Sequence, residues 1–246
     1  MDLSKVIAFA GKGGVGKSTI ATQLIRILSQ KDVILAIDAD PNSNLPEKLG
    51  IEIDGTIGDI RNKAVEDQDV PEGMSKHEYL FTSVRRLIAE TERIDMLVMG
   101  RPEGAGCYCF TNNVLKECFE ELIPKYEYTI IDNEAGLEHL SRKTIPYTDV
   151  LILVSDPTMI GIKTASRLRE LANEVRIQIK RTILVINNIT SGSDKLLSEA
   201  KRLGFDDIVT IPHDETISKA AVESVELNVL ENSSFGTAVQ RLVSIL

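Results

Sequence analysis

One segment near the N-terminus, GKGGVGKST at Gly11–Thr19, constrains the fold of this chain more than any other feature. A glycine, four residues and then Gly-Lys-Ser is the spacing of a phosphate-binding loop between a strand and a helix. Lys5–Ala10 before it is a short apolar run, and Ile20–Gln30 after it carries apolar residues at helical spacing. The segment therefore predicts a nucleotide-binding α/β fold.

The chemistry of this loop depends on its glycines and on the residues that open the helix. Glycines let the backbone curl so that successive N–H groups point at phosphate oxygens, and the positive end of the helix adds to this attraction. Lys17 is expected to reach the β and γ phosphates of ATP, and the Ser18 hydroxyl to bind Mg²⁺. The loop residues expected to contact the nucleotide are Gly11, Gly13, Gly14, Val15, Gly16, Lys17, Ser18 and Thr19.

The same glycines permit a second interpretation. Gly11, Gly13 and Gly16 satisfy the G-x-G-x-x-G pattern of dinucleotide-binding folds, and Asp38 lies near the spacing of a ribose-binding acid. That fold has no use for Lys17-Ser18 directly after the last glycine, nor for a carboxylate such as Asp132 at the end of a later strand. We therefore favour Mg·ATP over a nicotinamide or flavin cofactor.

Strand-like and helical patterns alternate along the chain. Several of the strand-like runs are almost continuously Val, Ile or Leu, as in parallel sheets that are covered on both faces. The chain has 246 residues, 43% of them hydrophobic, which suits one core. We expect a single domain over residues 1–246, an α/β fold with a doubly wound, mostly parallel sheet. The expected strands are Val6–Ala10, Val33–Ile37, Met96–Met99, Tyr128–Ile131, Val150–Val154, Thr182–Ile186 and Ile208–Ile211.

Carboxylates follow two of these strands. Asp38 and Asp40 come directly after Val33–Ile37, and Asp132 follows Tyr128–Ile131. Paired carboxylates on a strand-end turn suit Mg²⁺ and the handling of water, although a simple Asx turn would also favour aspartate there. Asp132 is the natural Mg²⁺-binding acid, directly or through water. Gly136 follows it and could donate its N–H to the γ-phosphate.

Cysteines form a second cluster of interest. Cys107 and Cys109 follow a Gly-Ala-Gly turn, which is not a core pattern. Thiolates select Zn, Cu(I), Ni or iron–sulfur iron, and two sulfurs do not complete a tetrahedral site. A symmetric dimer would supply four sulfurs to one ion. Cys118 lies in the following helix and is expected to be a core residue.

The loop with its additional lysine, Lys12, resembles the deviant Walker A group, which includes MinD and ParA ATPases and the nitrogenase iron protein. In that group the first lysine crosses a dimer interface to the partner's nucleotide, which implies a catalytic role in trans for Lys12. The resemblance also implies that Asp40 positions the attacking water and that Asp38 lies near the Mg²⁺ water shell. Positions matching Asn187, Pro212 and His213 contact adenine, although His213 also suits an ordinary strand-end turn.

Two further strings, GRPEGAGCYCFTNN and DNEAGLEHLSRKT, resemble CooC-type ATPases, which help to insert nickel into carbon monoxide dehydrogenase. The resemblance covers essentially the whole chain. It implies an ATP- and ADP-binding homodimer that holds Ni²⁺ or Zn²⁺ on Cys107 and Cys109 between subunits, with a carbon monoxide dehydrogenase-type enzyme as its target. Glu134 is unusual so near to phosphate, and it could pair with a lysine such as Lys12 of the other subunit.

Other functions remain open. One is an iron–sulfur electron donor like the nitrogenase iron protein, although that family takes its cysteines from separate loops. Another is a MinD- or ParA-like positioning ATPase, although the C-terminal segment Ser233–Leu246 has only one basic residue and is expected to pack on the sheet. The net charge of −9 disfavours nucleic acid. Three cysteines, no signal peptide and no long apolar run predict a cytoplasmic protein without a membrane partner.

Overall fold

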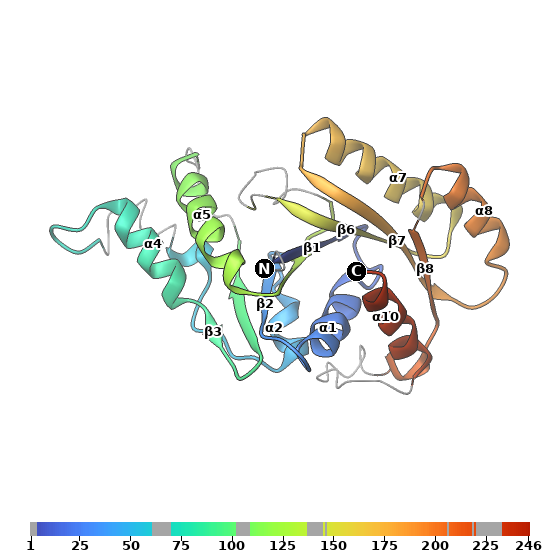
Figure 1. Cartoon of the computed structure of the whole chain (residues 1–246), viewed down its shortest axis with the longest axis horizontal. Helices are drawn as coiled ribbons and strands as arrows, with labels where there is room; N and C mark the ends of the chain where they lie inside the picture. The colour runs from blue at the N-terminus through green and yellow to red at the C-terminus, as the bar shows by residue number, and fades with distance from the viewer. Residues whose placement is uncertain are drawn as a thin grey trace.

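A computed structural model describes residues 4–60, 70–101, 109–136, 145, 147–205, 207–217, 219 and 233–246. Its centre is an eight-stranded sheet with the strand order β3-β4-β2-β5-β1-β6-β7-β8 (Figure 1). Every pairing in this sheet is parallel except that of β3 with β4. The strands are β1 (Lys5–Gly11), β2 (Ile34–Ala39), β3 (Ala89–Glu90), β4 (Ile94–Val98), β5 (Tyr128–Asn133), β6 (Thr148–Ser155), β7 (Ile179–Ile189) and β8 (Asp207–Pro212).

Helices cover both faces of the sheet. One face packs against α1 (Lys17–Leu28), α2 (Asn44–Leu49) and α10 (Ser234–Ser244). The other face packs against α4, α5, α7 and α8 and the short 3-10 helix η1. Their bounds are α4 (Lys76–Arg86), α5 (Cys109–Leu122), η1 (Ile123–Lys125), α7 (Met159–Glu174) and α8 (Asp194–Arg202).

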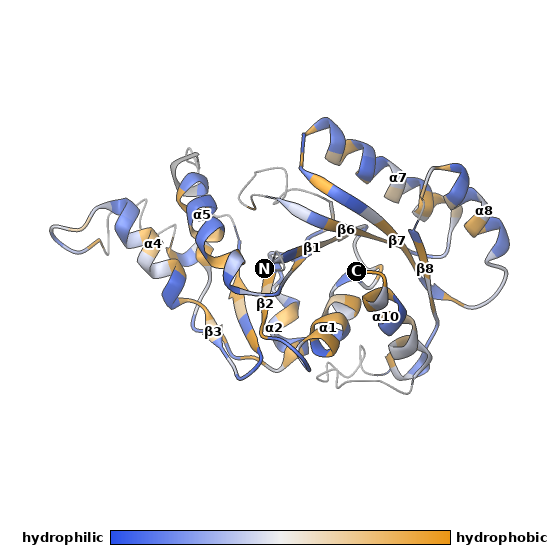
Figure 2. Cartoon of the chain, in the orientation of Figure 1, coloured by the Kyte–Doolittle hydropathy of each residue, from blue (hydrophilic) through white to orange (hydrophobic). Residues whose placement is uncertain are grey.

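The alternation of side chains along the strands explains this layering. In β1, Val6 and Ala8 face the cluster that contains α5 and α7, whereas Ile7 and Phe9 face α1 and α10. Both sets are fully buried, so the strand is apolar at every position. Strand β2 and helix α1 consist largely of hydrophobic residues, whereas α7 and α8 carry hydrophilic residues on their outer sides (Figure 2). The doubly wound, mostly parallel sheet predicted from the sequence is confirmed.

The register of the sheet brings its functional strand ends together. Asp38 of β2 lies opposite Asp132 of β5, and Gly11 of β1 lies opposite Val154 of β6. Parallel strands end at one edge, so the residues that follow β1, β2 and β5 gather there. The phosphate-binding loop and the carboxylates predicted from the sequence therefore lie at the same edge of the sheet.

Several element boundaries differ from the expected ones. The second strand starts at Ile34 instead of Val33, whose side chain is 41% exposed beyond the end of the sheet. The first helix begins at Lys17, directly after the loop, rather than at Ile20. The polar region Glu52–Glu78 contains none of the strands expected from the sequence, and it ends in the first turn of α4, which starts at Lys76. Serine and glutamate form a capping box there, a signal that the hydrophobic pattern alone does not contain.

The C-terminal helix packs on the sheet, as expected. Phe235, Val239 and Leu242 of α10 are buried against the strands and α1. Arg181 of β7 donates to the carbonyl of Ile245, and Lys5 Nζ donates to the carbonyl of Leu246 at 2.6 Å. Among the described residues, no helix is both long and apolar enough to cross a bilayer.

Candidate nucleotide site

The loop after β1 adopts a shape that needs glycine at its two ends. Gly16 has φ 96° and forms the N-cap of α1, and a Cβ there would lie 2.4 Å from the Asn187 amide nitrogen. A Cβ on Gly11 would lie 2.3 Å from the backbone oxygen of Val154. Either contact would force the neighbouring group to move. The loop therefore sits tightly between β6 and the end of β7.

Lys17 lies on the first turn of α1 and is buried. Its Nζ donates to the loop carbonyls of Lys12 at 3.2 Å and Gly11 at 3.4 Å. Burial lowers the pKa of this ammonium group, and the nearby carboxylates of Asp132, Asp40 and Glu134 act in the opposite direction. The structure thus brings together Lys17 of the loop, Asp40 of the turn after β2, and Asp132 and Glu134 at the end of β5.

Asp132 is the most constrained of these acids. It is 1% exposed, and its Oδ1 has no hydrogen-bond partner within the described part of the chain. Burial raises the pKa of this carboxyl to about 6, against the effects of a hydrogen bond with Ser18 and the charge of Lys17. A buried carboxylate oxygen without a partner, next to a serine hydroxyl, is a donor set that fits a hard cation such as Mg²⁺.

Asp38 and Asp40 organise the turn after β2. Asp38 is fully buried, and its two oxygens accept hydrogen bonds from the backbone N–H groups of Asp40 and Leu45, both at 2.9 Å. Burial raises the pKa of the Asp38 carboxyl to about 7. Asp40 is half-buried and accepts from the backbone of Asn42 at 2.9 Å. Asp38 therefore supports the turn and the start of α2, and its part in the Mg²⁺ water shell stays a prediction.

A cavity of about 260 Å³ adjoins the loop on the side of β7 and β8. Asn187 Nδ2 donates to the Val15 carbonyl at 2.8 Å, which joins this cavity to the loop. His213 Nδ1 and Asn188 Oδ1 lie 2.6 Å apart at its margin. The cavity is lined by Gly14, Val15, Gly16, Thr19, Asp156, Pro157, Asn187, Asn188, Pro212, Asp214, Ile217 and Phe235.

Three residues of this cavity were missed by the sequence reasoning. Asp156 directly follows β6, so the strand-end signal that identified Asp132 applies to it as well. Asn188 has φ 65°, a conformation that asparagine tolerates better than most residues. Asp214 accepts from the backbone N–H of Thr216 at 3.0 Å and lies 3.2 Å from Ser234 Oγ. It thereby ties the cavity to α10, a contact that sequence spacing does not reveal.

The remaining predicted residues occupy varied positions. Lys12 is exposed beside the loop, and Gly136 has φ 111°, with no atom of the described residues within 4 Å of the position of a Cβ. Cys107 lies outside the described residues, and Cys109 is the first residue of α5. Within the described ranges, no group of three or more His, Cys, Asp or Glu side chains is placed to hold a metal ion.

Cys118 belongs to α5 and is a core residue that is 4% exposed. Burial, followed by the charges of Glu121 and Glu117, raises the pKa of its thiol to about 12. A thiol of this kind is inert at neutral pH. The expectation that Cys118 is a core residue is confirmed.

A glycine-rich loop on a parallel sheet, with a buried lysine and a strand-end acid beneath it, defines a P-loop nucleotide-binding protein. The chain belongs to the CobQ/CobB/MinD/ParA nucleotide binding domain family, whose sequence profile matches residues 6–227. It is an ATP-binding P-loop ATPase of the MinD/ParA type.

Individual relatives agree with this membership. The chain is 43% identical over 243 residues to an uncharacterized ATP-binding protein of Methanocaldococcus jannaschii, with 96% of each chain covered. It is 32% identical over 229 residues to the carbon monoxide dehydrogenase accessory protein CooC of Rhodospirillum rubrum, covering 87% of this chain and 86% of that protein. The crystal structure of a ParA family ATPase from Chlorobium tepidum superposes with a TM-score of 0.73 at 21% identity, covering 99% of both chains.

Proposed function

We propose that this chain is a single-domain, ATP-driven dimeric switch that carries nickel for a carbon monoxide dehydrogenase-type enzyme. The observation that supports this proposal is that one chain combines a complete loop-and-acid nucleotide site with a Cys-x-Cys string, whose second cysteine begins α5. The similarity to the accessory protein CooC supports the same assignment.

In this proposal the loop backbone and Lys17 bind the β and γ phosphates, and the charges of Asp132, Asp40 and Glu134 oppose the lowering of the Lys17 pKa by burial. Ser18 and Asp132 would hold Mg²⁺, which neutralises phosphate charge, and Asp38 would contact its water shell. Asp40 would orient the attacking water from the turn after β2. The adenine-contacting residues would be Asn187 and Pro212, which line the cavity beside the loop, and His213, which contacts the lining residue Asn188.

The switch would couple the nucleotide to the cargo through the second subunit. Lys12 is exposed, so it is free to reach a partner's nucleotide and stabilise charge on the transferring phosphoryl group. The γ-phosphate would draw in the N–H of Gly136 and close the dimer. Cys107 and Cys109 from both subunits would then offer four thiolates to one Ni²⁺ or Zn²⁺ cargo ion.

The decisive experiment measures native mass and bound metal with ADP and with a non-hydrolysable ATP analogue. We expect a metal-free or weakly loaded monomer with ADP, and a dimer with one soft metal ion with the analogue. A Cys107→Ser/Cys109→Ser variant should dimerise normally but lose the ion, and Cys118→Ser serves as its matched control. A double variant that still binds one Ni²⁺ or Zn²⁺ per dimer would refute the cysteine site.

A second candidate is a MinD- or ParA-like positioning ATPase. It is supported by the family, which includes MinD and ParA, and by the fold shared with a ParA family ATPase. Co-sedimentation with anionic lipid vesicles and with duplex DNA, each with and without ATP, tests it. ATP-dependent binding to either, with no metal bound to the native dimer, would replace the metal-carrier proposal.

A further inference from the structure

A groove lies between α4 and α5, away from the nucleotide site. These two helices extend from the body beyond the β3–β4 end of the sheet (Figure 1). The groove encloses about 460 Å³ and is lined by His77, Glu78, Phe81, Thr82, Glu117, Glu120 and Glu121. The two helices contribute Leu80, Val84, Val114, Leu115, Cys118 and Phe119 to the core, and Phe81 packs against that core from a partly buried position. The charged residues that line the groove are not part of this core.

The floor of the groove is aromatic. Phe81 is half-buried and stacks on the His77 ring, with the ring centroids 6.1 Å apart and an interplanar angle of 12°. The Arg85 guanidinium lies 6.0 Å from the centroid of the Phe81 ring. Because part of the ring stays accessible, it offers an apolar surface to an incoming side chain.

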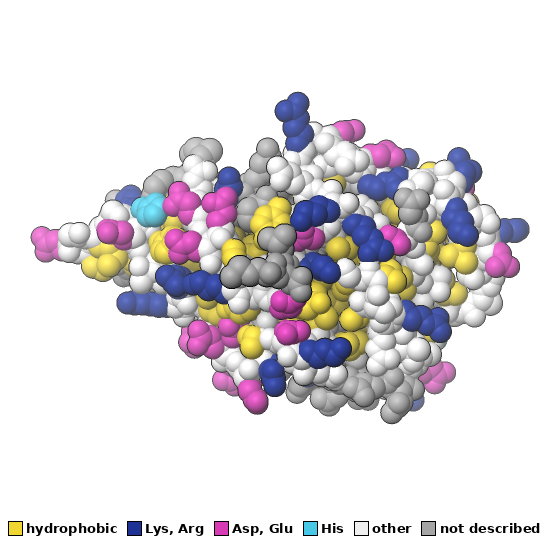
Figure 3. All heavy atoms as spheres, in the orientation of Figure 1, with side chains coloured by type: hydrophobic (Ala, Val, Ile, Leu, Met, Phe, Trp, Pro, Cys, Tyr) yellow, Lys and Arg dark blue, Asp and Glu magenta, His cyan; other side chains and the backbone are white. Residues whose placement is uncertain are grey.

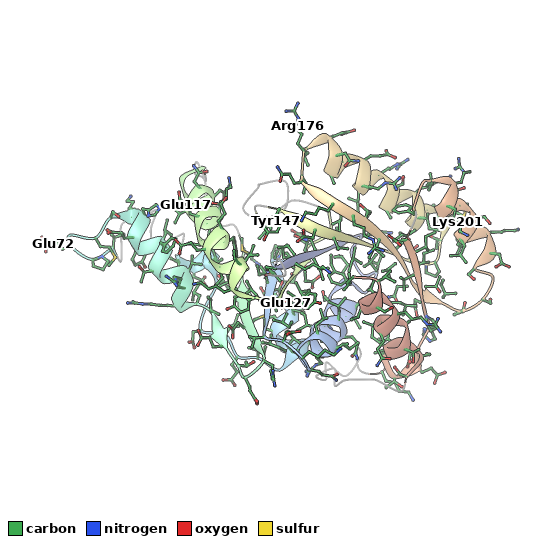
Figure 4. The ribbon with its side chains drawn as sticks, viewed as in Figure 1. Glu72, Glu117, Glu127, Tyr147, Arg176 and Lys201 are labelled. Carbon is green, nitrogen blue, oxygen red and sulfur yellow. The ribbon has the colours of Figure 1, made fainter. Side chains whose placement is uncertain are left out.

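Four carboxylates surround this floor. His77 Nε2 lies 2.7 Å from Glu117 Oε2, and both side chains are about half exposed. Glu117, Glu120 and Glu121 have the spacing at which like charges on a helix repel one another. Acidic side chains gather around the histidine over α4 and α5, with hydrophobic atoms beneath them (Figure 3). Glu117 projects from α5 toward α4 (Figure 4).

We propose that this groove docks a basic amphipathic helix of a partner protein. An apolar residue of the partner would rest on Phe81, and Lys or Arg residues one turn to either side would face Glu117, Glu120 and Glu121. Charge complementarity selects this occupant, because the groove carries four carboxylates, of which Glu117 lies 2.7 Å from His77 and Glu120 lies 3.6 Å from Lys116. A basic segment of the partner adds positive charge to this acidic surface and covers Phe81, whereas nucleic acid is repelled by it.

The groove lies next to α5, so a docked partner would be placed beside the helix that begins at Cys109. It is built on α5, the helix that begins at Cys109, and it is separate from the loop and the cavity that adjoins it. A partner held there lies along the helix that starts at the Cys-x-Cys string. The inference goes beyond the proposed metal transport, since docking does not require that a metal be carried.

The test uses the full chain and a fluorescein-labelled amphipathic peptide of leucine and lysine, followed by fluorescence anisotropy at two salt concentrations. Wild type should bind one peptide per chain, more weakly at high salt. Glu117→Gln/Glu120→Gln/Glu121→Gln should weaken binding about tenfold. The matched control Glu52→Gln/Glu92→Gln/Glu174→Gln removes the same charge elsewhere and should stay within about twofold of wild type. Both variants should keep wild-type ATPase activity and thermal midpoint.

Several results would overturn the inference. If the groove variant and the control variant weaken peptide binding equally, the loss is explained by the net charge of the protein and not by the groove. Equal binding of a peptide with the same composition but scrambled, non-amphipathic order would remove the role of Phe81. A photo-crosslinker placed at Thr82 that captures a second copy of the chain, rather than the peptide, would make the groove a self-association surface. Zn²⁺ titration that binds at His77 and Glu117 and excludes the peptide would make it a metal site.

Discussion

Replacing Asp132 with asparagine should separate the stability of the nucleotide-free protein from its use of Mg²⁺. Burial raises the pKa of this carboxyl from an ordinary 3.8 to about 6. That difference corresponds to about 3 kcal/mol by which ionised Asp132 disfavours the folded state above pH 6. Asparagine keeps an acceptor for Ser18 and removes the buried charge. Lys17 loses one of three neighbouring acids, which offsets part of the gain. We expect a net stabilisation of about 1–2 kcal/mol at pH 8.

The pH dependence follows from the sign of the shift. A pKa raised in the folded state means that the native protein binds the proton more tightly than the unfolded chain does. The advantage of Asp132→Asn should be absent below about pH 4, grow between pH 4 and pH 6, and be constant above that. Urea denaturation without nucleotide, at pH 5 and pH 8, measures it. Isothermal titration with ADP should show that the Mg²⁺-dependent part of the nucleotide affinity is lost.

Asp207 provides a control, because its pKa is shifted in the opposite direction from that of Asp132. Its hydrogen bond with Arg181, at 2.7 Å, lowers the pKa of its carboxyl. The stability from this pair is present at neutral pH and lost as the pH falls through the lowered pKa, so Asp207→Asn should destabilise the protein at pH 8. An Asp132→Asn variant that is less stable than wild type at pH 8, or that hydrolyses Mg·ATP normally, would refute our account of Asp132.

Three further changes test the site more locally. Gly16→Ala should cost about 1–2 kcal/mol of unfolding free energy because of its positive φ, and weaken ATP binding by displacing Asn187; wild-type affinity would contradict the tight packing. Lys12→Ala should leave stability within about 0.5 kcal/mol yet reduce ATP turnover about 10³-fold; normal turnover would exclude a role in trans. Ser233→Ala removes the 2.9 Å bond from Gly236 N and should lower the unfolding free energy by about 1 kcal/mol, measured in urea.

The strands and their polar ends could be predicted because their signals are local. A buried parallel strand is apolar at every position, and the polar residues after it stand out, as Asp38 and Asp132 do. Helix α4 was not predicted, because its start depends on a capping box rather than on the hydrophobic pattern, whereas α5 was expected as the helix that contains Cys118. Cys118 was correctly placed in the core, since a single cysteine at helical spacing behaves as a small hydrophobe.

By itself, the sequence determined the ligand class and the order of the polar strand ends, because the loop chemistry and the hydrophobic periods are encoded in neighbouring residues. Only the tertiary structure decided which groups meet. It set Asp38 beside Asp132, directed both Asp38 oxygens to backbone N–H groups, and joined Asp214 to α10. Such contacts depend on strand register and on side chains far apart in the chain. Burial depends on them too, and burial is what shifts the pKa values of the site's acids.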